Sequence, residues 1–363
     1  MTGLACEQNL TLLAEQMREL NPAAVAVASK EARGTAAYAE LKSRFPKIEF
    51  IEGESPVLAL AGRESDITLS AIVGAAGLLP SLSALGAAKR LAIANKETLV
   101  MAGDLFMERA AASGAEIIPV DSEHSAVFSL LQGISKGDIS RILLTASGGS
   151  LRNVPLSELA VATPAQVLAH PTWNMGSKIT VDSATMMNKG FEIIEAHHLF
   201  DMPYDKIQAV LHPESRVHSM VETADGAVYA HMGVADMSLP ILNAFTYPKR
   251  RENGFGKLDF TKGFSLNFEP WDAARYPALE LCYKAGRAGG ALPAIVNGAN
   301  ESAVKAFLDG KIAFTDIVLV VEYAMSSLAG GKASSIDDIL EADRKARETS
   351  DKYIKIKIER SVI

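Results

Sequence analysis

The chain has 363 residues, of which 48% are hydrophobic and 22% charged, and its formal net charge is −7. This composition is typical of a folded protein and excludes a mainly disordered chain. The negative charge argues against a basic surface for nucleic acid or anionic lipid, so we expect neither as a partner. Length alone predicts two or three domains.

The two cysteines, Cys6 and Cys282, lie far apart and outside any metal-type spacing, which favours free thiols in a reducing cytoplasm. The N-terminus has no basic flank and no apolar core of a signal peptide, so we expect a cytoplasmic protein. Residues 69–88 carry no charge over a length that could span a membrane. Their glycines, serines and proline favour a strand, a turn and a helix instead.

The first 120 residues alternate helical and strand patterns, as a parallel sheet with crossover helices does. The predicted helices are 10–20, 31–45, 80–89 and 99–112, and the predicted strands are 24–28, 48–51, 67–73, 91–94 and 116–120. No Gly-x-Gly-x-x-Gly turn precedes the first helix. Gly74 and Gly77 follow a later strand, where close packing of a strand against a helix also explains them.

The middle of the chain predicts strands and helices together, and its end predicts helices alone. The predicted strands are 141–145, 208–212, 217–223 and 227–231, the last two joined by an Asp-Gly hairpin turn. The predicted helices are 156–162, 164–169, 182–200, 276–288, 292–309, 315–328 and 335–352, with a loop at 170–178. We therefore predict an α/β protein with a Rossmann-like parallel-sheet domain (1–120), an α+β domain with antiparallel hairpins (121–244), a linker (245–272) and a C-terminal helical bundle (273–363).

Two carboxylates directly follow the predicted strand 116–120. Asp121 and Glu123 lie at the edge of the sheet where α/β proteins bind ligands, and a turn there would aim both at one cation. The alternative is a helix start, in which Asp121 or Ser122 caps the next helix.

Three polar residues share one face of the predicted helix 182–200. They are Asn188, Lys189 and Glu192, spaced three or four residues apart. Glu192 could join Asp121 and Glu123 in an all-oxygen site for Mg²⁺ or Mn²⁺, while Lys189 could neutralise a phosphate. The alternative is a solvated Lys–Glu pair on an exposed helix.

Two loops are further candidates. Residues 145–150 (Thr-Ala-Ser-Gly-Gly-Ser) follow a strand and could form an anion-binding nest or an ordinary turn. The loop 170–176 carries Trp173 and Met175, which suit either a lid that excludes water from a ligand or a plug at the edge of a core.

Several segments together resemble the 1-deoxy-D-xylulose 5-phosphate reductoisomerase family. They are AIVGAAGLLPSL (71–82), ANKETLV (94–100), PVDSEHSAVF (119–128), LLTASGG (143–149), HPTWNMGSKITVDSATMMNKGFEIIEA (170–196) and HPESRVHSMV (212–221). The resemblance covers nearly the whole chain. It implies a homodimeric enzyme of non-mevalonate isoprenoid biosynthesis that converts 1-deoxy-D-xylulose 5-phosphate to 2-C-methyl-D-erythritol 4-phosphate. It also implies NADPH and a divalent ion, Mn²⁺ or Mg²⁺ with Co²⁺ as a further candidate.

The resemblance also implies roles for individual residues. The implied metal ligands are Asp121, Glu123 and Glu192. The implied catalytic residues are Lys96, Glu123 and His170. The implied substrate contacts are Ser122, Glu123, Ser147, His170, Trp173, Ser183, Asn188, Lys189 and Glu192, with the phosphate held by Ser147, Ser183, Asn188 and Lys189 and with His218 at the back of the site. The implied cofactor contacts are Asn9, Gly74, Ala75, Asn95, Lys96, Glu97 and Gly176.

One feature of the family is missing from the sequence. Family members begin with a strand and a Gly-Ser-Thr-Gly-Ser-Ile-Gly turn, about 30 residues or one strand–turn–helix unit that this sequence lacks. Residues 5–9 (Ala-Cys-Glu-Gln-Asn) also offer no positive charge to a 2′-phosphate. We therefore expect complete metal and substrate sites but an incomplete pyrophosphate cradle. Two alternatives stay open: a form that binds metal and substrate without NADPH, and a metal-dependent isomerase without redox activity.

Overall fold

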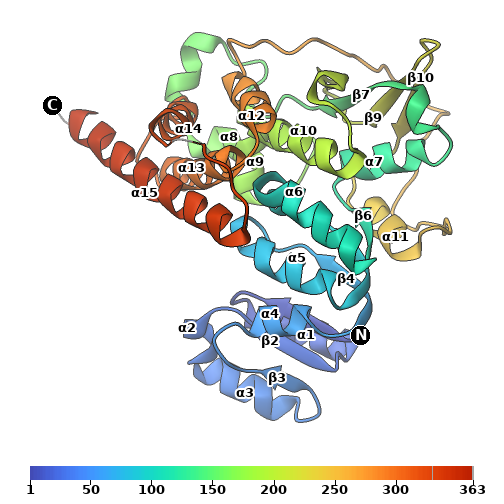
Figure 1. Cartoon of the computed structure of the whole chain (residues 1–363), viewed down its shortest axis with the longest axis vertical. Coiled ribbons are helices and arrows are strands. Elements are labelled where there is room, and N and C mark those ends of the chain that lie inside the picture. The colour runs from blue at the N-terminus through green and yellow to red at the C-terminus, as the bar shows by residue number, and fades with distance from the viewer. Residues whose placement is uncertain (329, 362–363) are drawn as a thin grey trace.

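The computed structural model describes residues 1–328 and 330–361 and begins with a small parallel sheet (Figure 1). This N-terminal lobe contains β1 (Gly3–Cys6), α1 (Leu10–Leu20), β2 (Ala24–Val27), α2 (Lys30–Arg33), α3 (Ala36–Arg44) and β3 (Glu49–Ile51). The strands pair in parallel in the order β1-β2-β3. Small apolar residues make β2 fully buried, as expected for a central parallel strand covered on both faces.

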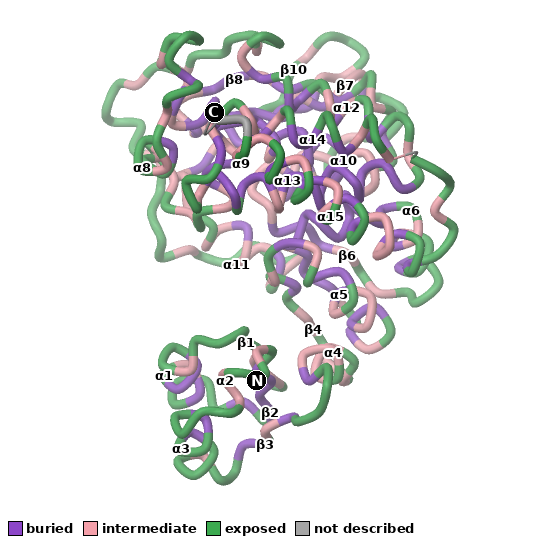
Figure 2. Tube along the Cα trace, turned by 90° about the vertical axis from the view of Figure 1, so that its left-hand side faces the viewer, coloured by how far each residue is buried: buried purple, intermediate pink, exposed green. Residues whose placement is uncertain are grey.

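A second parallel sheet follows, in the order β4-β5-β6. Its elements are α4 (Pro56–Ala61), β4 (Ser65–Ser70), η1 (Ala75–Gly77), α5 (Leu78–Leu85), β5 (Ala88–Ile93), α6 (Lys96–Ser113) and β6 (Glu116–Pro119). Helix α4 packs against both β2 and α5 and so connects the two sheets (Figure 2). The predicted parallel, Rossmann-like organisation is confirmed, as two separately hydrogen-bonded sheets of three strands.

The middle of the chain forms a mixed sheet in the order β10-β9-β7-β8. Its elements are α7 (Ser122–Leu131), η2 (Lys136–Asp138), β7 (Ile139–Ala146), η3 (Leu156–Val161), α8 (Pro164–Leu168), α9 (Ser177–Thr185), α10 (Met187–Phe200), η4 (Tyr204–Lys206), β8 (Ile207–Leu211), β9 (Val217–Thr223), β10 (Val228–Met232) and α11 (Ser238–Thr246). The hairpin between β9 and β10 is the predicted one, with Gly226 at a φ of 85° in its turn. Strand β7 pairs with β8 in parallel and with β9 in antiparallel fashion.

The C-terminal part is helical, as predicted. It consists of α12 (Pro277–Ala288), α13 (Leu292–Leu308), α14 (Asp316–Ser327) and α15 (Ile336–Ser361). The almost wholly buried α13 packs against α14, α15 and also α6, so these helices are joined to the second parallel sheet. Over the described part of the chain, no helix is both long and apolar enough to cross a bilayer.

Two segments that the sequence predicts as single helices are each divided into two helices in the structure. The predicted helix 31–45 is interrupted because the Thr35 hydroxyl accepts the backbone N–H of Tyr38 and starts α3 anew. The predicted helix 182–200 is wrong at its start, because Met186 adopts a left-handed conformation with a φ of 63° between α9 and α10. The break redirects the chain so that α10 begins at the cleft described below. The domain boundaries at 120, 244 and 272 stay a prediction.

Candidate functional site

A cleft of about 220 Å³ opens at the carboxyl ends of β6 and β7, between α7, α9 and α10. Most of the side chains predicted to bind metal or substrate line it. These are Lys96, Asp121, Ser122, Glu123, Ser147, Trp173, Ser183, Asn188, Lys189 and Glu192, together with His218. The position agrees with the rule that parallel strands present ligand sites at their carboxyl ends. Among the predicted substrate residues, His170 alone is outside this lining.

Three carboxylates converge in the cleft. Asp121, Glu123 and Glu192 each offer an oxygen atom, and these atoms lie within 4.8 Å of one another. Asp121 also caps α7, because its Oδ1 accepts the backbone N–H of Glu123 at 3.1 Å. Asp121 is therefore both a helix cap and a candidate metal ligand. The cap fixes its side chain, and its second carboxylate oxygen lies 2.8 Å from Lys96 Nζ. A buried set of three carboxylates fits a hard divalent ion.

Two lysines hold these carboxylates together. Lys96, at the start of α6, donates to Asp121 at 2.8 Å and to Glu192 at 3.2 Å. Lys189 donates to the other oxygen of Glu192 and lies 3.6 Å from Glu123. The side chains of Lys189 and Glu192 are only 4% and 1% exposed. The alternative of a solvated pair on an exposed helix is therefore wrong.

The carboxylates differ in their preference for a proton. Burial, together with the charges of Glu192 and Asp121, raises the pKa of Glu123 to about 8 against the opposing effect of Lys189. Burial also favours the protonated form of Asp121, but Lys96 and His124 hold its pKa well below the usual range. The raised pKa of Glu123 indicates that the lysines do not fully balance the negative charge at this carboxylate. A divalent cation would supply the missing positive charge, so the residues present fit a metal ion.

A buried pair behind the carboxylates was missed by the sequence analysis. His124 Nδ1 lies 3.0 Å from Asp121 and 3.4 Å from Glu195, while its Nε2 lies 2.8 Å from the carbonyl oxygen of Glu192. Because both ring nitrogens face acceptors, the ring is an imidazolium; although burial lowers its pKa, Glu195 and Asp121 raise it to about 9. The His124 ring thus contacts two of the candidate metal ligands, the carboxylate of Asp121 and the backbone carbonyl of Glu192. Its spacing of three residues from Asp121 was the available signal.

Ser147 lines the cleft, and His170 supports it from behind. His170 Nδ1 accepts the backbone N–H groups of Thr172 and Trp173 at 3.1 and 3.0 Å, so its proton resides on Nε2. Nε2 donates to Ser147 Oγ at 3.0 Å, and Gly149 N–H donates to the same oxygen at 3.1 Å. Since Ser147 accepts two hydrogen bonds, its own proton is left for a ligand in the cleft.

The loop with Trp173 lies over the cleft rather than inside a core. The Trp173 ring is half-buried and contacts the ring of His218, with centroids 6.2 Å apart. Asn174 and Met175 of the same loop also line the cleft. A further lining residue that the sequence analysis missed is Ser215, which has a φ of 49° between β8 and β9.

Most of the predicted cofactor residues gather at one edge of the second parallel sheet. Asn95 Nδ2 donates to the carbonyl oxygen of Gly74 at 3.1 Å and to Glu97 at 3.0 Å. Lys178, two residues after Gly176, donates to Glu97 at 2.8 Å. Glycine suits the turn at Gly74, whose φ is 76°.

Two further predicted cofactor contacts, Ala75 and Asn9, make hydrogen bonds within the protein. The backbone N–H of Ala75 donates to the carboxylate of Glu301 on α13 at 3.0 Å. Asn9 lies apart from the other residues, in the N-terminal lobe, where its side chain caps α1. The expected incompleteness of the pyrophosphate cradle stays a prediction.

Comparisons with known proteins match nearly the whole length of the chain. The family model described as 1-deoxy-D-xylulose 5-phosphate reductoisomerase matches residues 1–103. Two models of the C-terminal domain of that enzyme match residues 117–200 and 232–349. A relative of that name from Chlorobium phaeobacteroides is 49% identical over 351 residues, which is 96% of this chain and 91% of the relative. One from Gloeobacter violaceus is 46% identical, covering 99% of this chain and 91% of the relative.

Solved structures agree with the sequence comparisons. The 1-deoxy-D-xylulose 5-phosphate reductoisomerase of Zymomonas mobilis in complex with NADPH is 39% identical with a TM-score of 0.88, over 97% of this chain and 91% of that one. A DOX-P reductoisomerase in complex with NADPH, fosmidomycin and magnesium is 37% identical with a TM-score of 0.90, over 98% of this chain and 91% of that one.

Proposed function

The chain belongs to the 1-deoxy-D-xylulose 5-phosphate reductoisomerase family, and from this premise we propose that the cleft between α7, α9 and α10 is its active site. The protein is an NADPH- and divalent-metal-dependent enzyme that converts 1-deoxy-D-xylulose 5-phosphate to 2-C-methyl-D-erythritol 4-phosphate in isoprenoid biosynthesis. The alternative of a form that binds metal and substrate without NADPH is not favoured by these relatives.

Asp121, Glu123 and Glu192 would hold the metal ion, which is Mg²⁺ or Mn²⁺. When bound, the ion supplies Lewis acidity toward the substrate's carbonyl and hydroxyl oxygens and orients them. Glu123 holds a proton at its carboxylate in the metal-free state and gives it up when positive charge arrives. Lys96 is kept protonated by Asp121 and Glu192 despite its burial, so its ammonium can donate to an oxygen that gains negative charge.

The phosphate of the substrate would bind on the other side of the cleft. The hydroxyl protons of Ser147 and Ser183 are available there, and Lys189 contributes positive charge. Asn188 and Ser122 keep the carboxylates in place, since Asn188 donates to Glu192 and Ser122 donates to Glu123 at 2.6 Å. Binding energy at a phosphate far from the reacting carbons orients the substrate for the rearrangement.

The loop over the cleft would exclude water during the reaction. His170 couples this loop to the phosphate side, because it bonds to the backbone of Trp173 and to Ser147. Closing Trp173 onto the substrate would protect the rearranged aldehyde from side reactions.

NADPH would approach from the edge formed by Gly74, Ala75, the start of α6 and Gly176. When bound, it supplies the hydride that reduces the rearranged aldehyde. Lys96 belongs to this edge and to the cleft, so its position fits the junction of cofactor and substrate. Asn9 stays a proposed cofactor contact from the N-terminal lobe, where its side chain caps α1.

The oligomeric state, the location and the domain organisation of the protein are also part of the proposal. We propose a homodimer that pairs through the strand-rich middle of the chain, where β10 is an edge strand with Val228 and Tyr229 half exposed. We propose a cytoplasmic location, consistent with the free thiols of Cys6 and Cys282. We also keep the four segments 1–120, 121–244, 245–272 and 273–363 as the proposed domain organisation.

The convergence of three largely buried carboxylates and two lysines in one cleft is the observation that carries the assignment of the site. The test is to follow NADPH absorbance and branched product together, using the purified chain with 1-deoxy-D-xylulose 5-phosphate and Mn²⁺. We expect one NADPH consumed per product, and no turnover after chelation of the metal. Product without NADPH consumption would instead support the redox-free isomerase.

A further inference from the structure

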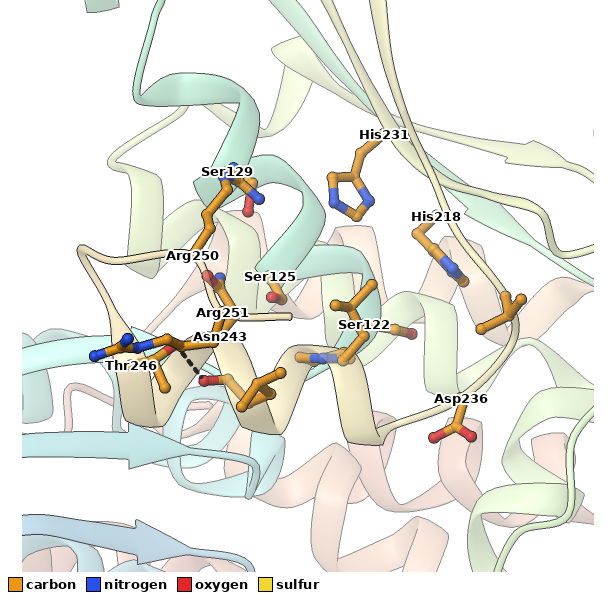
Figure 3. Close-up of a pocket in the computed structure, with 14 residues that line it drawn as sticks. Ser122, Ser125, Ser129, His218, His231, Asp236, Asn243, Thr246, Arg250 and Arg251 are labelled. Atoms are coloured by element: carbon orange, nitrogen blue, oxygen red, sulfur yellow. Dashed lines mark hydrogen bonds between the residues drawn. The ribbon is translucent and has the colours of Figure 1, made fainter. Parts of the chain in front are cut away.

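A second hollow, of about 120 Å³, lies beside the active-site cleft, between α7, β9, β10 and α11. It shares Ser122 and His218 with the cleft but not the phosphate-side residues. We call it the Arg250 hollow; its polar lining includes Ser125, Ser129, His231, Asn243, Arg250 and Arg251 (Figure 3). Figure 3 shows Arg250 reaching toward Ser129, with the rings of His218 and His231 on the opposite side.

The polar groups of this hollow have almost no partners in the protein. Within residues 1–328 and 330–361, neither Arg250 nor Arg251 makes a hydrogen bond or an ion pair. His231 Nδ1 is buried and has no hydrogen-bond partner there either. A buried polar atom without a partner is costly and calls for an explanation. Ser129 and Asn243 add two more side chains without a partner among the described residues.

The charge in the hollow is positive. Its single acidic lining residue, Asp236, is already occupied, because its carboxylate accepts the backbone N–H of Ser238 at 2.7 Å. The arginines follow α11, whose end is held by Arg90, which donates to the carbonyl oxygens of Ala244 and Tyr247 at 3.1 and 2.7 Å. The guanidinium of Arg250 and the hydroxyl groups of Ser125 and Ser129 are donors that match the acceptors of a phosphate group, and the exposed Arg251 adds positive charge nearby.

The remaining wall is apolar. Val234, Leu239, Pro240 and Leu242 also line the hollow. A volume of about 120 Å³ admits a phosphate group with a short alkyl chain and excludes a nucleotide. We propose that the Arg250 hollow is a second anion site of this enzyme, which binds a phosphate dianion, free or esterified to a short alkyl chain.

The test is to count phosphate sites by isothermal titration calorimetry on the full chain with Mg²⁺ present. We expect the wild type to bind two phosphates, one in the cleft and one in the hollow. The variant R250Q/R251Q should bind one, while S147A/S183A should lose the other. The charge-matched control R109Q/K284Q, which changes exposed residues on α6 and α12, should keep both. The cleft and the hollow are thus tested by different variants.

A second measurement separates the two sources of the anion and guards against misfolding. The variant H231Q keeps a side chain of similar length, and we expect phosphate in the hollow to bind it several-fold more weakly than wild type. Butyl phosphate should bind the hollow at least tenfold more tightly than inorganic phosphate if an ester is the ligand, and equally well if free phosphate is. A wild type with a single phosphate site, or an R250Q/R251Q variant that retains two, would overturn the proposal.

Discussion

The ammonium of Lys96 lies 2.8 Å from the carboxylate of Asp121, and this contact joins the start of α6 to the cap of α7. Both side chains are nearly buried, 8% and 10% exposed. In the metal-free protein, Lys96 supplies part of the positive charge that a bound metal ion would provide. Removing it would leave only Lys189 and His124 to balance the three carboxylates in a low-dielectric cleft.

We therefore predict that Lys96→Met destabilises the metal-free protein by about 3–5 kcal/mol. Saturating Mn²⁺ should restore part of the loss, because the ion replaces the missing positive charge. Urea unfolding with and without Mn²⁺ measures both effects. The control Lys89→Met removes the exposed pair with Asp66, and we expect almost no loss of stability because solvent screens this pair. Equal losses for the two variants would show that the buried contact has no special role.

Metal affinity should depend on the protonation of Glu123. Its pKa is raised to about 8, so below that pH the metal must displace a proton. We predict that Mn²⁺ binding weakens by up to about tenfold for each pH unit below 8 and levels off above it. Titrations in buffers of different ionisation enthalpy should detect the released proton. In Glu123→Gln the proton release should disappear; if it persists unchanged, another group is responsible.

Trp173 should affect the substrate more than the metal. In Trp173→Ala the loop loses its contact with His218, so we predict a KM for 1-deoxy-D-xylulose 5-phosphate raised at least about tenfold. The dissociation constant of Mn²⁺ should change less than about twofold, because the ring contacts none of the three carboxylates. Steady-state kinetics and a Mn²⁺ titration provide the comparison. Parallel losses in both quantities would assign Trp173 a folding role.

The sequence was sufficient to predict most of the parallel strands and the edge of the sheet at which their carboxyl ends lie. The alternation of apolar segments and glycine turns predicted five of the six strands β1–β6, all but β1. Residues directly after a strand must lie at its carboxyl end, so Asp121 and Glu123 could be placed at the edge of the sheet. Helical spacing then brought Asn188, Lys189 and Glu192 to one face. These inferences rest on local geometry, which the sequence encodes directly.

The sequence was insufficient where distant contacts decide the structure. The left-handed Met186 breaks a pattern that predicts one helix, and α9, directly before the break, packs closely against Gly149 of a distant turn. The contact of His124 with Glu195 joins α7 to α10 and cannot be inferred from spacing along either helix. The Arg250 hollow likewise depends on how α11 packs beside β9 and β10.

Gly149 allows α9 to approach the turn after β7. It has a φ of 73°, and a Cβ atom there would lie 2.4 Å from the Cα of Ala184. We predict that Gly149→Ala destabilises the protein by about 2–3 kcal/mol or more and lowers activity with it. Gly137→Ala is the matched control, since nothing lies within 4 Å of the added atom. Thermal unfolding distinguishes the two; a tolerated Gly149→Ala would contradict the described approach.

The most direct test of the account is to titrate Mn²⁺ against the wild type and Glu192→Gln, detecting free ion by electron paramagnetic resonance. Glu192 is 1% exposed and bonded to both lysines, so glutamine keeps its volume while removing one negative oxygen donor. We predict one Mn²⁺ per wild-type chain, and an affinity at least about tenfold weaker in the folded variant. An unchanged affinity would contradict the claim that these three carboxylates form the metal site.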